Sequence, residues 1–157
     1  MLLAGLLAGS ILAAPVAAQS PAPAGSSAAA AAPTPYRPNR GSRHATAYYG
    51  AIWGVDSLSV KSVESGEIIR FSYRILDAVK AQTLNDKKVE PVLIDAQAGA
   101  KLAIPSLEKV GQLRQSSTPE AGRSYWMAFS NKGRLVKPGD RVDVVIGQFR
   151  ADGLVVQ

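Results

Sequence analysis

Arginine and tryptophan side chains are the groups of this chain best suited to recognise a ligand, and four of them form the candidate site: Arg70, Arg74, Arg123 and Trp126. In the segment 68–76, apolar and polar side chains alternate, and Arg70 and Arg74 both lie on its polar face. If the segment that carries Trp126 is a neighbouring strand, an indole lies beside guanidinium groups, which suits an anionic or sugar-containing ligand. The alternative is that Trp126 covers the sheet or joins the core while Tyr125 is exposed, because both parities of that segment are apolar.

Catalytic residues of the common kinds are missing from the part of the chain that is patterned to fold. His44 is the only histidine, it precedes the alternating segments, and there is no cysteine, so triad chemistry and zinc or copper sites lack their usual groups. The carboxylate pairs Glu64/Glu67 and Asp140/Asp143 fall at turns, whereas hydrolysis needs two carboxyl groups that converge in a cleft. We therefore expect a protein that is not an enzyme and that holds no metal and no cofactor.

The net charge of +6 divides equally between the residues ahead of the patterned region and the region itself. Of the 18 Lys and Arg residues, Arg37, Arg40 and Arg43 precede it, which leaves 15 basic residues interspersed with 12 acidic ones. Nucleic-acid binders carry a clustered basic stripe, so we expect no nucleic-acid partner. The basic patch ending at His44 either contacts anionic lipid headgroups or polysaccharide, or belongs to a solubilising linker.

The N-terminus reads as a secretory signal peptide over residues 1–18. The uncharged apolar run from Leu2 to Ala18 is shorter than the roughly 20 residues of a membrane-spanning helix, and its small residues at the end suit signal peptidase. We expect the mature chain to begin near Gln19 in the periplasm or outside the cell, with no stable membrane span after cleavage. A retained anchor is the alternative, because no Lys or Arg precedes the run.

Residues 19–47 are predicted to be a disordered Pro/Ala-rich linker. They hold five of the ten prolines and no Ile, Leu, Val, Met, Phe or Trp, so they cannot bury enough apolar surface to repay the entropy of ordering. The remaining residues, 48–157, are enough for one domain with its own core. That core must be stable without disulfides.

Two-residue alternation of apolar and polar side chains predicts short antiparallel strands from Trp53 onward. A short helical turn interrupts them over residues 76–84, where Asp77 is a capping residue. Pro91 predicts either an edge strand or a strand that begins after it, and Trp53 is expected to close one end of the fold. About seven strands in this length predict an all-β, immunoglobulin-like antiparallel β-sandwich. The segments are residues 57–61, 68–76, 89–95, 101–104, 110–115, 125–129, 141–146 and 154–156.

Five segments of the domain resemble an uncharacterised family of exported, periplasmic bacterial proteins with an immunoglobulin-like β-sandwich. They are Trp53-Gly54-Val55, residues 71–77, residues 92–95 with 99–102, residues 110–114, and the closing VIGQFRADGLVVQ. The likeness covers the chain from about Trp53 to its end and leaves the linker out. Because that family carries no assigned catalytic residue and no assigned ligand, the resemblance implies location and fold rather than activity.

These observations predict an exported, non-catalytic binding or accessory module of the bacterial cell envelope. Its partner is expected to be an envelope protein or an anionic or sugar ligand. The alternative is a structural or assembly subunit that pairs with another protein through a sheet edge.

Overall fold

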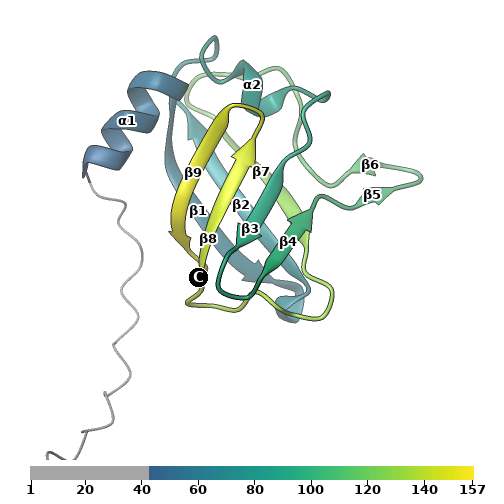
Figure 1. The fold of residues 1–157 in the computed structure, drawn as a ribbon. Helices are drawn as coiled ribbons and strands as arrows, with labels where there is room; N and C mark the ends of the chain where they lie inside the picture. The colour runs from purple at the N-terminus through teal and green to yellow at the C-terminus, as the bar shows by residue number, and fades with distance from the viewer. Residues whose placement is uncertain (1–42) are drawn as a thin grey trace, which may run out of the picture. The chain divides into compact units, whose positions relative to one another are not determined.

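Antiparallel strands dominate the computed structural model, which describes residues 43–157 (Figure 1). The predicted signal peptide and most of the predicted linker lie outside the described residues. The helical elements are α1 (Arg43–Trp53), the 3-10 turn η1 (Glu64–Gly66) and α2 (Gln82–Asn85). None of the helices within residues 43–157 has the length and apolar character to span a membrane.

The strands form two larger sheets and one small hairpin. The first sheet has the order β1-β2-β7, with β1 (Val55–Val63), β2 (Ile68–Ile75) and β7 (Ser124–Ser130). The second has the order β4-β3-β8-β9, with β3 (Val92–Asp95), β4 (Ala100–Ala103), β8 (Arg141–Ile146) and β9 (Phe149–Val155). The two-residue strands β5 (Ser106–Leu107) and β6 (Gly111–Gln112) form the hairpin that extends from the sheets in Figure 1.

One hydrophobic core receives the inward-facing residues of both larger sheets. Phe71 of β2 and Met127 of β7 are fully buried in the same cluster as Leu93 of β3 and Val144 of β8. The alternation in β2 is followed residue by residue, because its apolar positions are buried and its arginines are exposed. The expected predominance of β-structure in antiparallel sheets is therefore confirmed.

The first and second sheets are joined along one side by the end of the chain. Val60 of β1 forms a parallel bridge with Val156, the Gln157 amide donates to the Val60 carbonyl at 2.9 Å, and the Ser62 amide donates to the Gln157 carbonyl at 2.7 Å. These bonds satisfy part of the outer edge of β1, which would otherwise be a free row of peptide groups.

The helix α1 is the main departure from the sequence-based expectation, because residues 43–47 were assigned to the disordered linker. A helix of 11 residues is marginal in water, so its stability must come from contacts that the local sequence does not reveal. Tyr49 and Trp53, one helical turn apart, place their rings 5.9 and 5.5 Å from that of Phe149 in β9. Trp53 therefore packs against the β8–β9 hairpin from a helix rather than from an extended segment.

Of three smaller expectations, one is confirmed and two are met in part. The Asp77 carboxylate accepts from the amides of Val79 and Lys80 and so caps a turn, but the helix α2 begins only at Gln82 and has Ala81 at its N-cap with no side-chain hydrogen bond. Strand β3 begins after Pro91, which was one of the two alternatives. The strand expected over residues 110–115 is reduced to the two residues of β6, and its partner β5 was not predicted.

Candidate ligand-binding face

The strand register brings Arg70 and Trp126 to the same surface of the first sheet. Ser72 of β2 lies directly opposite Trp126 of β7, so the side chains of Arg70 and Arg74, two positions either side, emerge on the same face as the indole. Tyr125 is buried, with 3% of its surface exposed. The alternative in which Trp126 joins the core and Tyr125 is exposed is therefore wrong.

Arg70 lies over the Trp126 ring. The guanidinium carbon is 4.8 Å from the ring centroid, within the range of a cation–π interaction. The backbone amide of Trp126 donates to Oε1 of Gln115 at 3.2 Å, and the Trp126 carbonyl accepts from the Gln115 amide at 3.0 Å. The backbone of Trp126 is thus held by the segment that follows β6. The indole of Trp126 in turn orients the Arg70 guanidinium.

Arg74 lies on the same face, but its charge is already matched. Its Nε and Nη2 atoms donate to the two carboxylate oxygens of Asp56 at 2.9 and 2.6 Å, which is a bidentate pair. The hydrogen bond from Arg74 lowers the pKa of Asp56, and the same bond raises the pKa of Arg74. Arg74 is therefore a neighbour of the candidate site rather than a free cation.

Arg123 lies in the turn before β7, away from Arg70. Its side chain donates to Oε1 of Glu120 at 2.8 Å, and both side chains are more than half exposed. Its carbonyl accepts from the amide of Ile75 at 2.9 Å, so its backbone closes the end of the β2–β7 pair. Of the four residues in the candidate site, the structure thus joins Arg70 to Trp126, places Arg74 nearby and separates Arg123.

Lys61 is the site residue that the sequence analysis did not include. It lies directly opposite Arg70 across the β1–β2 pair, exposed on the same face. Within residues 43–157, neither Lys61 nor Arg70 forms an ion pair with a carboxylate. Alternation places Lys61 on the polar face of its strand. Which residue of β2 lies opposite Lys61 depends on the register shift between Asp56 and Ser59, and no pattern in the sequence specifies that shift.

A second polar cluster lies beneath the surface near α2. The Tyr73 hydroxyl donates to Oδ1 of Asn85 at 2.6 Å, and Arg114 donates to the carbonyls of Asp86 and Val89. Burial raises the pKa of Tyr73 and lowers that of Arg114. All these donors are engaged with the protein itself, so we interpret the cluster as structural.

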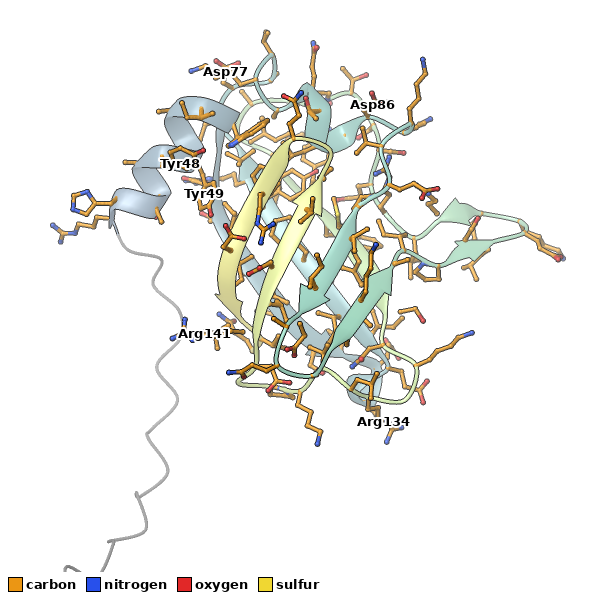
Figure 2. All side chains as sticks on the ribbon, in the orientation of Figure 1. Tyr48, Tyr49, Asp77, Asp86, Arg134 and Arg141 are labelled. Carbon is orange, nitrogen blue, oxygen red and sulfur yellow. The ribbon has the colours of Figure 1, made fainter. Side chains whose placement is uncertain are left out.

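An open depression of about 490 Å³, lined in part by Asp86, adjoins this cluster. It lies at the end of the sheets where Figure 2 shows Asp86 and Asp77, opposite the end that carries Arg134. The lining is polar and carries a single ionisable side chain, that of Asp86. Its lining residues are Gln82, Thr83, Asn85, Asp86, Ser116, Ser117, Thr118 and Pro119.

The alternative function, assembly with another protein, requires a sheet edge whose backbone groups are free to pair with a second chain. The free side of β7 bonds to residues 113–115, and part of β1 bonds to the end of the chain. Tyr49 of α1 packs beside β9, with its ring centroid 5.9 Å from that of Phe149, and burial raises the pKa of Tyr49. The remaining edge strand, β4, has four residues with an exposed Lys101, a pattern that disfavours pairing with another chain.

The comparisons with protein-family models, curated proteins and solved structures find no match for this chain. Within residues 43–157, no three His, Cys, Asp or Glu side chains gather as metal ligands would. The functional argument therefore depends on the geometry of Arg70, Trp126 and Lys61.

Proposed function

We propose that this protein is an exported, non-catalytic binding module of the bacterial cell envelope, and that its ligand binds on the outer face of the first sheet. The observation that carries the proposal is the Arg70 guanidinium held over the Trp126 indole on an exposed face, beside Lys61. A cation–π contact of this kind is worth about 0.5–1 kcal/mol at an exposed site, enough to favour one position of a long side chain before a ligand arrives.

The order of the strands supports an immunoglobulin-like sandwich as the scaffold. β1-β2-β7 corresponds to strands A-B-E of that fold, and β4-β3-β8-β9 corresponds to C′-C-F-G. The disulfide that marks antibody domains has no counterpart, since the chain has no cysteine. In this correspondence the ligand face is the A-B-E sheet, built on strands rather than loops, so its side chains are held with little freedom.

Assembly through a sheet edge is the weaker proposal. The edges of β1 and β7 are partly bonded within the chain, α1 packs beside β9, and β4 is short and carries a lysine. A binding module is expected to remain monomeric with and without ligand. Sedimentation at several protein concentrations distinguishes the two, because an edge-pairing subunit would oligomerise.

Ligand binding is tested through the fluorescence of Trp126. The sequence has two tryptophans, so Trp53→Phe leaves Trp126 as the reporter. We expect dextran sulfate or vesicles containing anionic lipid to change its emission, and Arg70→Ala to weaken this binding about tenfold. Arg150→Ala, an exposed arginine of the second sheet, is the matched control and should bind normally. Emission unaffected by any anionic probe would contradict the proposal.

Export is tested by the mature N-terminus. The apolar run and its small-residue end predict a chain that begins near Gln19 in the envelope fraction. Mass spectrometry of the protein from fractionated cells measures both location and cleavage. A chain that retains Met1 in the cytosol would overturn the exported part of the proposal and leave the binding face to be judged on its own test.

A further inference from the structure

We infer, resting on the proposed function, that the group recognised on this face is a phosphate held between Lys61 and Arg70, with Trp126 as a positioning residue for Arg70.

Two positive side chains lie directly opposite each other on this face. Lys61 and Arg70 are paired residues of adjacent strands, so their Cα atoms are about 5 Å apart and their side chains rise from the same face. Like charges in this arrangement destabilise a sheet unless an anion lies between them. Within the paired residues of β1 and β2 the acidic residue is Asp56, and both its oxygens are engaged with Arg74. Glu64 and Glu67 follow the last pair of the register, and neither forms an ion pair with Lys61 or Arg70, since Glu67 pairs with Arg134. The two cations are therefore left for a group from outside.

An anion bound between Lys61 and Arg70 has two positive charges to balance. A carboxylate brings one negative charge and balances only one of the two cations. A phosphate monoester brings about −1.5 to −2 at neutral pH and has three acceptor oxygens, so it can accept from the guanidinium and the ammonium together. The match in charge and in number of acceptors favours phosphate over a uronic acid.

Trp126 contacts Arg70 and leaves little of its ring face for a ligand. A solvent-accessible indole is often a platform for a sugar ring, but Trp126 is half-buried and Arg70 occupies its face, 4.8 Å from the ring centroid. The contact uses the face of the ring and leaves guanidinium N–H groups free to donate to an anion. Trp126 thus acts through Arg70, and the ligand is recognised by its charge rather than by stacking.

The phosphate has two possible carriers, a lipid headgroup and a soluble phosphorylated sugar, and the experiment separates them. Full-length Trp53→Phe protein is titrated with inorganic phosphate, glucose 6-phosphate, glucuronate and methyl glucoside. It is also titrated with phosphatidylcholine vesicles, with and without phosphatidic acid. We expect glucose 6-phosphate to bind about tenfold more tightly than glucuronate, and methyl glucoside not to bind. A response limited to the phosphatidic acid vesicles assigns the phosphate to a lipid.

Variants identify the residues responsible. Lys61→Ala and Arg70→Ala should each weaken glucose 6-phosphate or phosphatidic acid binding about tenfold, whereas Lys101→Ala on the second sheet should not. Calorimetry of the Trp126 variants, carried out well below the melting temperature of each, tests positioning: Trp126→Phe keeps an aromatic face and should bind more tightly than Trp126→Ala. Equal binding of the two variants would refute the positioning role.

The outcomes separate this inference from the proposed function. Glucuronate that binds as tightly as glucose 6-phosphate, with the same dependence on Arg70, refutes phosphate selectivity and retains a ligand face. Methyl glucoside binding that depends on Trp126 but not on Lys61 has the same effect. Binding of no probe, dextran sulfate included, refutes both.

Discussion

Tyr73 places a hydroxyl group within the hydrophobic core, and a chain of bonds connects it to the surface. The hydroxyl donates to Oδ1 of Asn85, and Nδ2 of Asn85 donates to the Ser117 carbonyl at 2.8 Å. Both side chains are at least 95% buried. A buried polar group without a partner costs about 1–3 kcal/mol, so this short network must be kept whole.

Replacing Tyr73 with Phe tests the network through its pH dependence. We expect a loss of about 1–3 kcal/mol at pH 7, because Asn85 loses its donor. Burial raises the pKa of Tyr73 above the ordinary 10.0, so above pH 10 the unfolded chain ionises while the folded chain stays protonated. Wild-type stability should thus fall as pH rises beyond 10, by up to about 1.4 kcal/mol per unit more than that of Tyr73→Phe.

Urea unfolding from pH 7 to 11 measures this difference. Tyr48→Phe, which removes an exposed hydroxyl, is the control and should follow the wild type. If Tyr73→Phe loses stability in parallel with the wild type above pH 10, the hydroxyl is not protected in the folded state.

Gly54 is the residue at which a side chain is excluded by both backbone and space. It has φ +62°, and an added Cβ would lie 2.7 Å from the Asp77 carbonyl oxygen. We expect Gly54→Ala to cost more than about 2 kcal/mol, since the left-handed conformation and the contact both oppose it. Gly99→Ala, with a similar φ and nothing within 4 Å, should cost only about 1 kcal/mol. Thermal melts with equal losses for the two variants would show that the contact with Asp77 is relieved cheaply.

The helix α1 has no buried residue, yet it contacts the sheets through one row of side chains. Tyr49 and Trp53 meet Phe149, and the Lys80 ammonium donates to the carbonyl of Ala51 at 2.8 Å. Figure 2 shows Tyr48 and Tyr49 on this helix. The sequence could not reveal the helix because Phe149 comes from the far end of the domain. In contrast, β2 was predicted well because its alternation is local.

Two adjacent tyrosines of α1 give a matched test of how the helix is held. Tyr49→Ala should lower stability by about 1–3 kcal/mol, because its ring packs on Phe149 and against the hydrophobic core. Tyr48→Ala, at a position 54% exposed, should change it by less than about 0.5 kcal/mol. Hydrogen exchange of the α1 amides should rise in the first variant only. Equal effects would mean that α1 is not fixed through the Phe149 contact.

The candidate site shows which information a sequence holds and which it lacks. Alternation was sufficient to place Arg70 on an outward face, but it left Trp126 open, because both parities of its segment are apolar and only the buried Tyr125 decides between them. It was insufficient for Lys61, whose neighbour is set by the irregular register of β1, where Ser57 has φ +53°. It was also insufficient for Arg74 and Arg123, whose ion pairs with Asp56 and Glu120 depend on the strand register and on a turn geometry that alternation does not encode.

The closure between the two sheets depends on the last two residues of the chain. Val156 is fully buried, and its backbone bonds to Gly139 and Asp140 while that of Gln157 bonds to Val60 and Ser62. Deleting both residues removes the buried Val156 side chain, exposes the core residues it covers, and removes four backbone hydrogen bonds. We therefore expect the free energy of unfolding to fall by more than about 3 kcal/mol, with a lower melting temperature. Gln157→Ala keeps the backbone and should melt like the wild type. If the deletion variant retained its melting temperature, the joined edge would contribute nothing to holding the sheets together, and β1 would be available for strand addition.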